Sequence, residues 1–473
     1  MRKILSMLLC AVMLFTCISC AAQAPEIVPE YDAGISEDSI DLKGQTLIMG
    51  MVKDYFFEGE DSTLSYTNNT ELGDLAAQRL KDVEDKYNCK VEFNYVGRAG
   101  EVAFQSAVAG SYIFDFISEE SYFLVNYMKA NAFVDLTSLD NIDVFDESKW
   151  GNKNMRMSTM FDGAIYGLLP AAHPMREAIS VGNILVINGD HITNLLATDP
   201  RDYFENGEWN WATFSDCMNT YAHTSGISNE FVYALSSGFG GFSRELAMSN
   251  GVDPISIDSN GKFSVGYFSQ PAIEAYNQAW EWFYGTTAGN VLSEGVNTED
   301  FIAGNSVLHS TSVWKIISTT DSVAYTMDNF GIVPVPYGPN ALGPNDYTTS
   351  YSSAVFTMCI PITAKDPEIS ALVLDKIYEP FEGYETREEI LDYLYNNYFK
   401  DKRDAEFLMD ITSGDHIYYH DHMHDFSTMF DQFPNNGIVK SLESYEDKHY
   451  ENMERYVLPA YQTMVDYAEY FHE

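Results

Sequence analysis

An alternation of apolar strand and helix patterns constrains the fold of this chain more than any other feature. Residues 46–52 (TLIMGMV) form an apolar run typical of a buried strand, and residues 71–87 place apolar side chains on one face of a helix. Residues 90–96 alternate as in a second strand, and residues 113–117 predict a third. Strand, helix and strand in succession predict a parallel sheet covered by helices, which is an α/β fold.

A second region of the chain repeats this arrangement, and the chain after residue 386 is expected to be largely helical. The predicted elements are a strand at 179–188, a helix capped by Asn210, a hairpin at 255–265, a helix at 271–284, extended segments at 306–313 and 330–336, and a helix capped by Asp366 with Pro367 at its first position.

The N-terminus has the pattern of an export signal. Arg2 and Lys3 precede an apolar run over residues 4–18, which is shorter than the about 20 apolar residues that a permanent membrane helix needs. Cys17 and Cys20 match a redox C-x-x-C motif, but such a motif opens a helix within a βαβ unit. We therefore interpret the segment as a secretory signal.

The residues around Cys20 resemble the lipobox of bacterial lipoproteins, with Ser19 before the cysteine and two alanines after it. This resemblance implies that the signal is removed before Cys20 and that Cys20 carries a lipid. The third position before Cys20 is a cysteine, where the lipobox usually has Leu or another aliphatic residue. The alternative is ordinary cleavage near Ala22 or Ala24, which would leave a secreted protein without an anchor.

Charge and motif content exclude several functions. The chain has 70 acidic and 27 basic residues, a formal net charge of −43, which repels nucleic acid and anionic lipid. The signatures of P-loop nucleotide binders, zinc proteases and serine hydrolases are missing from the sequence. Glu119 and Glu120 are adjacent carboxylates that a glycosidase could use, although so acidic a chain contains many such pairs by chance. Cys89, Cys217 and Cys359 are too scattered for a disulfide framework and are expected to be buried.

A histidine-rich segment, HIYYHDHMH, is the one candidate metal site. Its four imidazoles with Asp421 would bind Zn²⁺ or a similar metal if the segment curled, but alternate residues of an extended segment point in different directions. The other interpretation is a surface patch that responds weakly to pH, and we expect no resident cofactor. The candidate ligands are His416, His420, His422 and His424.

Seven motifs in a fixed order resemble the extracellular solute-binding proteins of ABC importers, in particular those that carry sugars. They cover most of the chain from residue 45 to about residue 380. The motifs are LKGQTLIMGMV, DGAIYGLLPA, ILVINGDHI, NGEWNWATFSDCMNTY, FIAGNSVLHSTSVWKI, FGIVPVPYGPNA and AKDPEISALVLDKIYE.

The resemblance implies a periplasmic-binding-protein-like fold of type II, in which crossing strands join two α/β lobes that close on a solute like a hinged clamp. It implies a monomer on the outer face of the cell membrane that delivers a carbohydrate to a permease and transforms nothing chemically. The expected organisation is a signal peptide at 1–19, a flexible tether at 20–44, lobe 1 at 45–172 plus 337–385, and lobe 2 at 173–336 plus 386–473.

The resemblance also implies candidate ligand contacts. Trp314 is expected as an aromatic platform for a sugar ring, with a core tryptophan as the alternative. The other candidates are Tyr55 and Glu119 just past predicted strands, His173 and Arg176 beside the lobe crossover, and Phe242 after the GFGG turn. A binder of peptides or other organic solutes and a secreted glycoside-active enzyme remain alternatives.

Overall fold

The computed structural model describes residues 40–52, 61–226, 228–257, 262–318, 321–352, 355–413, 417–418 and 426–471. Asp41–Glu473 form one compact unit. The predicted signal peptide, the predicted lipidation site Cys20 and most of the predicted tether lie outside the described residues. None of the helices in the described part of the chain combines the length and the apolar composition that a membrane span requires.

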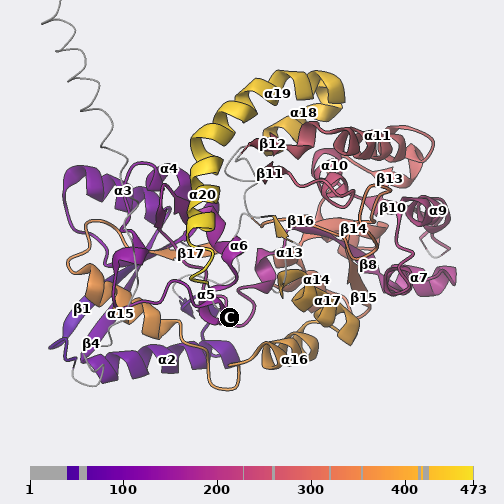
Figure 1. Cartoon of the computed structure of the whole chain (residues 1–473). Helices are drawn as coiled ribbons and strands as arrows, with labels where there is room; N and C mark the ends of the chain where they lie inside the picture. Colours follow the sequence, from indigo (N-terminus) through magenta and orange to yellow (C-terminus); the bar gives the residue numbers. More distant parts are fainter. Residues whose placement is uncertain are drawn as a thin grey trace, which may run out of the picture. The chain divides into compact units, whose positions relative to one another are not determined.

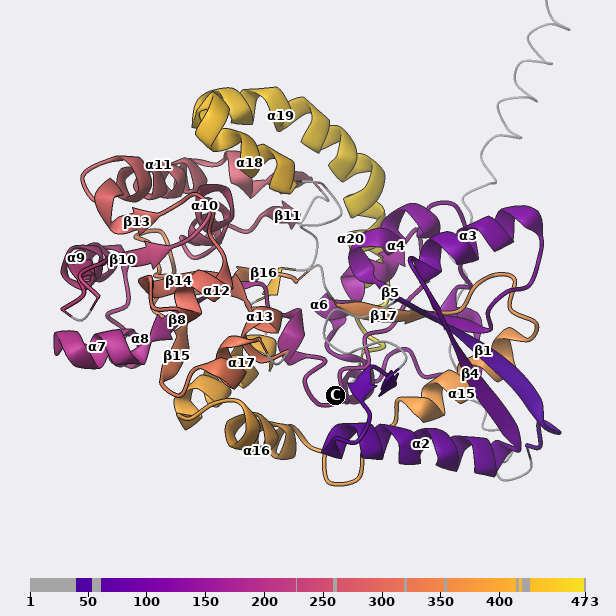
Figure 2. The same cartoon turned by 180° about the vertical axis from the view of Figure 1, so that it is seen from behind.

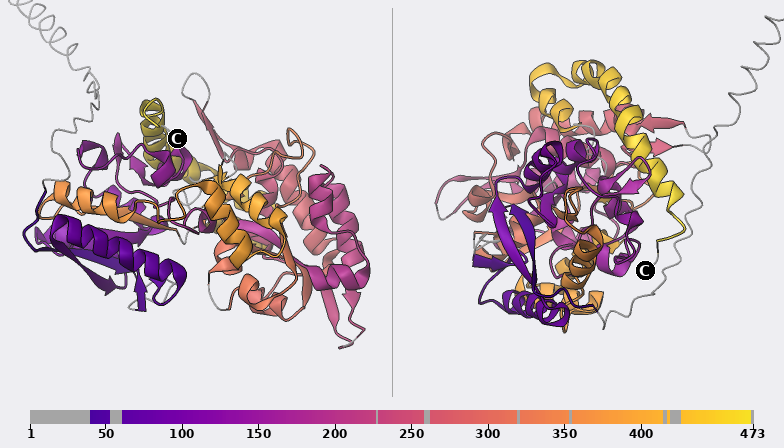
Figure 3. Two further views of the ribbon diagram at one scale, coloured as in Figure 1. Left: turned by 90° about the horizontal axis from the view of Figure 1, so that it is seen from below. Right: turned by 90° about the vertical axis from the view of Figure 1, so that its left-hand side faces the viewer.

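The first sheet has four strands in the order β17-β5-β1-β4. β1 is parallel to β4 and to β5, whereas β17 is antiparallel to β5. α2 (Glu71–Tyr87) has the predicted bounds and lies beside α15 (Pro367–Ile377) along this sheet (Figure 3, left). The strands are β1 (Gln45–Val52), β4 (Cys89–Val96), β5 (Phe116–Glu120) and β17 (Phe356–Cys359).

The third strand, predicted at residues 113–117, lies instead at Phe116–Glu120, so that prediction was wrong at both ends. The Asp115 carboxylate accepts a hydrogen bond from the Ile48 N–H at 2.7 Å, which replaces a strand carbonyl at the beginning of β5. At the other end β5 continues because it pairs with β17, whose Phe356 lies opposite Glu120. A partner more than two hundred residues away in the sequence extends the strand.

The second sheet follows the order β13-β10-β14-β8-β15, with β9 (His223–Thr224) paired to β10. β10 is parallel to β13 and β14, and β8 is antiparallel to its neighbours β14 and β15. Figures 1 and 2 show the strands of the two sheets in separate regions of the compact unit. The strands are β8 (Asn183–Asn188), β10 (Phe231–Ser236), β13 (Val291–Leu292), β14 (Ser306–Ser312) and β15 (Phe330–Val333).

Three connections link the sheets, and the first two lie against each other. The first runs from β7 (Ala164–Ile165) to β8, and the second from β15 to β17. The Gly182 N–H donates to the Ser350 carbonyl at 2.8 Å, and a Cβ on Gly182 would lie 2.1 Å from that oxygen. Only glycine allows this approach. The third connection joins α15 to α16 (Arg387–Asn397).

The helices of the second region confirm the sequence patterns. Asn210 caps α9 (Trp211–Tyr221) by accepting from the N–H groups of Ala212 and Thr213. α11 (Gln270–Tyr284) contains the predicted amphipathic helix, and β11 (Ile255–Ile257) pairs with β12 (Phe263–Val265) as a hairpin. Asp366 caps α15. Cys89, Cys217 and Cys359 are buried free thiols, as expected.

The described C-terminal part of the chain is largely helical and contacts both regions. α17 (Lys402–Ser413) packs on β15, and α18 (Phe426–Asn436) packs on α10 (Phe239–Met248). α20 (Leu458–Asp466) packs instead on β6 (Met160–Phe161), in the range expected for lobe 1. The exact lobe boundaries stay a prediction.

Candidate ligand-binding site

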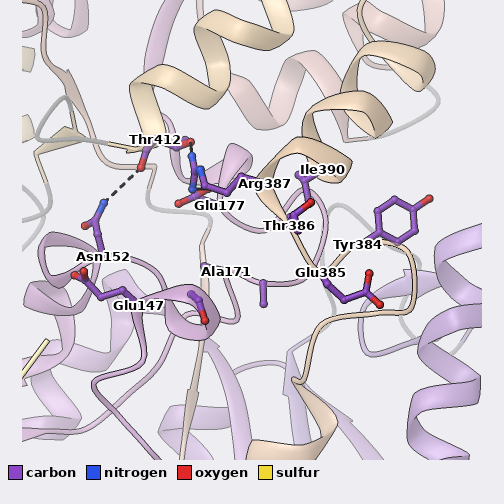
Figure 4. Close-up of a pocket in the computed structure, with 12 residues that line it drawn as sticks. Glu147, Asn152, Ala171, Glu177, Tyr384, Glu385, Thr386, Arg387, Ile390 and Thr412 are labelled. Atoms are coloured by element: carbon purple, nitrogen blue, oxygen red, sulfur yellow. Dashed lines mark hydrogen bonds and ion pairs between the residues drawn. The ribbon is translucent and has the colours of Figure 1, made fainter. Parts of the chain in front are cut away.

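A cavity of about 440 Å³ lies at the junction of the two lobes. One wall is α5 (Glu147–Trp150) with the turn after it, the floor is the first connection, and the other wall comes from α16 and α17. Figure 4 shows Glu147 and Asn152 on one side and Tyr384 and Glu385 on the other. The lining residues are Glu147, Ser148, Asn152, Ala171, Ala172, Glu177, Tyr384, Glu385, Thr386, Arg387, Ile390 and Thr412.

The first wall is held rigidly against lobe 1. The Asp146 side chain caps α5 by accepting from the Ser148 N–H at 3.0 Å. The next residue, Lys149, is buried and pairs with Asp375 at 2.8 Å near the end of α15. Because a buried charge is retained only when it is paired, this contact fixes α5 in one position.

The opposite wall is built on the N-terminus of α16. Thr386 and Glu389 form a reciprocal capping box, so the helix begins at a defined residue. The Arg387 guanidinium then donates to the Met409 carbonyl at 3.0 Å and to the Thr412 hydroxyl at 3.1 Å. These bonds join α16 to the C-terminal end of α17.

Arg387 also closes the cavity against its floor. Its guanidinium pairs with the Glu177 carboxylate of the first connection at 2.6 Å (Figure 4). The Glu177 side chain is 13% exposed and that of Arg387 is 48% exposed. The carboxylate is therefore largely shielded from solvent, whereas the guanidinium is half exposed. Burial raises the pKa of Glu177, and the positive charge of Arg387 opposes that rise. The pair therefore links α16 to the first connection.

One further contact spans the cavity from wall to wall. The Asn152 side-chain amide donates to the Thr412 carbonyl at 3.4 Å (Figure 4). Its oxygen accepts from the Met155 N–H at 3.1 Å, which fixes the amide orientation. A bond this long is weak and contributes little to holding the two walls together.

The charges of the lining favour one kind of ligand. The cavity contains the carboxylates of Glu147, Glu177 and Glu385 and one guanidinium, which is already paired with Glu177. Negative potential in a cleft repels anions. Carboxylates, an amide and hydroxyls are hydrogen-bonding groups suited to a neutral polyhydroxyl solute or to a cationic one.

The predicted contact Trp314 lies in α13 (Val313–Ile317), half-buried, with the Lys315 ammonium 4.2 Å from its ring centroid. α13 contacts the first connection near residues 178–180, and the Val313 N–H donates to the Val181 carbonyl. Trp314 is thus near the hinge but does not line the cavity, and its role as a sugar platform stays a prediction.

Glu119 lies within β5 and not after it, and its side chain is fully buried. One oxygen accepts from the Gly100 N–H at 2.8 Å, and the other from Arg98 at 3.2 Å. Arg98 also pairs with Glu120 and lies 3.6 Å from the centroid of the Phe123 ring. The Glu119 and Glu120 carboxylates therefore both pair with the Arg98 guanidinium.

His173 and Arg176 belong to the first connection but do not line the cavity. Burial and the nearby Arg176 charge lower the pKa of His173 well below its usual value, and its Nε2 lies 3.1 Å from the Glu379 carbonyl. Arg176 donates to the Leu64 carbonyl at 3.0 Å. Both residues therefore hold the first connection against lobe 1.

Phe242 is a core residue of lobe 2, with its ring centroid 5.5 Å from Phe283 and 5.9 Å from Phe214. Tyr55 and the histidine cluster His416, His420, His422 and His424 lie outside the described residues. Among the described residues, no cluster of three metal-ligating side chains occurs. None of the five predicted contacts that the structure describes is a lining residue of the cavity.

The cavity residues were missed for two reasons. Glu177 directly follows Arg176, which the resemblance placed beside the lobe crossover. The sequence therefore indicated the right segment but the neighbouring residue. Tyr384 and Arg387 lie where the resemblance to known motifs ends, and Glu147 and Asn152 belong to a segment without a recognisable pattern. Only folding brings these segments together.

Comparison with known proteins supports the fold. No protein-family profile and no curated protein sequence matches the chain. The ABC substrate-binding protein Lmo0181 of Listeria monocytogenes, solved with cycloalternan, has a TM-score of 0.54 at 14% identity and covers 87% of this chain and 99% of its own. The sugar-binding protein MalE of Xanthomonas citri has a TM-score of 0.54 at 12% identity, covering 90% and 99%.

A third solved structure, UgpB of Mycobacterium tuberculosis with glycerophosphocholine, has a TM-score of 0.56 at 13% identity and covers 81% of this chain and 95% of its own. Identities this low establish architecture only. The resemblance seen in the motifs is confirmed for the fold, and the chain has the two-lobe, type II fold of the solute-binding proteins of ABC importers.

Proposed function

We propose that this protein is an extracytoplasmic solute-binding protein that captures a carbohydrate at the lobe junction and delivers it to an ABC importer permease. The observation that carries the proposal is the cavity itself. Its walls come from lobe 1 on one side and from α16 and α17 on the other, while the first connection forms its floor. A solute in this cavity contacts both lobes and the hinge together.

Such a placement couples binding to closure. A ligand shifts the equilibrium between open and closed lobes only as far as it binds the closed arrangement more tightly. Contacts with Asn152 on one wall and Arg387 on the other exist together only when the walls are close. The same groups that bind the solute therefore supply the free energy of closure.

The chemistry of the lining supports a carbohydrate. Glu147 and Glu385 offer acceptors to sugar hydroxyls, Thr412 offers a hydroxyl, and Tyr384 combines an aromatic face with a polar end. The fold is shared with proteins solved with cycloalternan and described as sugar-binding. These features favour a neutral polyhydroxyl solute.

Another organic solute is the second candidate, because the fold is equally similar to a protein solved with glycerophosphocholine. The excess of carboxylates over free cations in the cavity suits a solute with a cationic group. A glycoside-active enzyme has less support, since the Glu119 and Glu120 carboxylates both pair with Arg98 and do not flank an open space.

Attachment to the membrane through a lipid on Cys20 is part of the proposal. A lipoprotein carries more than one acyl chain, which stable anchoring needs. Replacing Cys20 with serine should move the protein from the membrane fraction to the medium. Retention of the Cys20→Ser variant in membranes would contradict the anchor and leave the solute proposal intact.

The solute is tested by thermal unfolding of the chain from residue 21 against panels of saccharides, peptides and choline compounds. A binder gains stability with one class by mass action and leaves that ligand unchanged. Arg387→Ala should reduce the gain, whereas Lys402→Ala, which removes an exposed cation paired with Glu406, should preserve it. Turnover of a saccharide, or an unchanged gain in Arg387→Ala, would contradict the proposal.

A further inference from the structure

The C-terminal segment, residues 426–471, contacts both lobes in addition to the three connections between the sheets. Its first helix, α18, is fixed to lobe 2 by aromatic contacts. The Phe430 ring lies 5.0 Å from Tyr267, and the Phe433 ring lies 5.0 Å from Tyr276. A Cβ on Gly240 of α10 would lie 2.8 Å from the Phe430 carbonyl, so the two helices approach as closely as glycine allows.

The second helix, α19 (Ile438–Asn452), extends this attachment on lobe 2. The Tyr450 ring lies 5.8 Å from Phe263 and 6.3 Å from Phe268, beside the β11–β12 hairpin. Figures 1 and 2 show α19 leading away from α18 toward α20 in yellow. The segment leaves lobe 2 at the end of α19.

α20 attaches the segment to lobe 1 at one turn. Asp162 and Gly163 join β6 to β7 and both have positive φ angles, 51° and 82°, as a type I′ hairpin turn requires. The Gly163 N–H donates to the Thr463 hydroxyl at 2.8 Å, and the Tyr467 hydroxyl donates to the Gly163 carbonyl at 2.9 Å. The first connection begins directly after this hairpin. α20 is therefore bound to lobe 1 next to the start of that connection.

An aromatic cluster reinforces this attachment. The Phe145 ring of lobe 1 lies 5.4 Å from Tyr467, 5.5 Å from Tyr470 and 5.4 Å from Phe471. Aromatic pairs at these distances contribute beyond their buried area. Both ends of the segment are therefore packed, one on each lobe.

A π-helical turn, Met453–Val457, separates the two attachments. The Leu458 N–H donates to the Met453 carbonyl five residues earlier, which is the wide ring of a π-helix. Pro459 explains its position, because proline has no N–H and its ring clashes with the carbonyl four residues before it. The helical rod from α19 to α20 thus has one weak point, which lies between the lobes' attachments.

We propose that residues 426–471 act as a strap that limits how far the two lobes swing apart, with the π-helical turn as its pivot. Opening the lobes moves the two packed ends away from each other. The Gly163 hydrogen bonds and the Phe145 contacts must then break, or the pivot must straighten. The strap keeps the cavity walls near their closed arrangement before a solute arrives, which lowers the entropy lost on binding. The proposal rests on the two-lobe fold and is independent of which solute binds.

The distance between the lobes tests this proposal without any ligand. p-Acetylphenylalanine at Val108 on lobe 1 and at Tyr325 on lobe 2, both more than 70% exposed, carries spin labels for a pulsed dipolar measurement on the full chain. The variant Thr463→Val with Tyr467→Phe removes both hydrogen bonds to Gly163 with little change in volume. We expect its distance distribution to broaden and shift to longer values.

The matched control is Tyr461→Phe, because the Tyr461 hydroxyl on the same helix makes no hydrogen bond within the described residues. Its distribution should equal that of the unmodified chain. A second variant inserts Gly-Ser-Gly-Ser after Asn452, which lengthens the strap and leaves both attachments intact. It should broaden the distribution in the same way.

The insertion decides the question if the double variant does not fold, as judged by circular dichroism. Unchanged distributions in the insertion variant, or equal broadening in the Tyr461→Phe control, would overturn the proposal. Failure of every candidate solute to bind would leave this result unaffected, so the strap and the proposed function fail separately.

Discussion

Asp404 fixes α17 to lobe 2 and thereby places Thr412 at the cavity. One Asp404 oxygen accepts from the Ile332 N–H of β15 at 2.8 Å, and the other lies 2.9 Å from the Arg201 guanidinium. Arg201 also pairs with Asp199 at 2.7 Å and lies 3.4 Å from Asp401. One cation thus faces three carboxylates, of which Asp404 is the most buried.

The magnitude follows from proton binding. Burial raises the pKa of Asp404 from 3.8 to about 7, while the charge of Arg201 opposes the rise. Between these values the folded state holds a proton that the unfolded chain has lost. The stability from this proton is fully present below pH 3.8 and is lost as the pH rises to about 7. The slope is about 1.4 kcal/mol per pH unit, or about 4 kcal/mol over the whole interval as an upper value.

The substitution Asp404→Asn mimics the protonated acid and removes this titration. We expect the free energy of unfolding of the variant, measured by urea denaturation from pH 4 to pH 7, to fall less steeply than that of the unmodified chain. Comparing the two curves cancels the pH dependence of the other acidic groups. Glu406→Gln on the exposed face of α17 is the matched control and should follow the unmodified chain. Parallel curves for Asp404→Asn and the unmodified chain would refute the reasoning.

Three further predictions concern stability and reactivity. Gly182→Ala should lower the free energy of unfolding, measured in a urea titration, by more than about 2 kcal/mol, because the added Cβ would overlap the Ser350 carbonyl. Near-normal stability of this variant would contradict the close packing of the two connections. Thr70→Ala should cost about 1 kcal/mol through loss of the cap on α2, and no change would show that water replaces the cap. Burial raises the pKa of Cys89 and Cys217 to about 11 and raises the pKa of Cys359 well above its usual value. These thiols should therefore resist alkylation at pH 8 until urea unfolds the chain, as mass spectrometry would show.

Local sequence patterns predicted much of the fold because their causes are local. The spacing of apolar residues in 71–87 determines which face of α2 is buried, and a single side chain, Asn210, determines where α9 begins. Such signals depend on the helical repeat and on hydrogen bonds within a few residues. They also explain why the order of strands and helices predicted an α/β fold, whereas the two-lobe class was implied by the resemblance of the seven motifs.

The residues of the candidate site, in contrast, could not be predicted from local sequence patterns. Glu119 was expected at an open strand end, but pairing with β17 draws it into the sheet and Arg98 neutralises it there. The cavity combines Asn152, Glu177 and Arg387, which are separated by more than two hundred residues from first to last. Their proximity comes from the packing of α16 and α17 across the first connection.

The sequence by itself determined the α/β character, the position of most helices and strands, and the acidic surface, because each depends on residues near one another in the chain. Tertiary structure alone decided which polar groups share a cavity and that the C-terminal helices return from lobe 2 to Gly163 on lobe 1. Contacts of this kind depend on how distant segments pack. Their free energy comes from buried area and hydrogen bonds formed only in the folded chain, which no local pattern records.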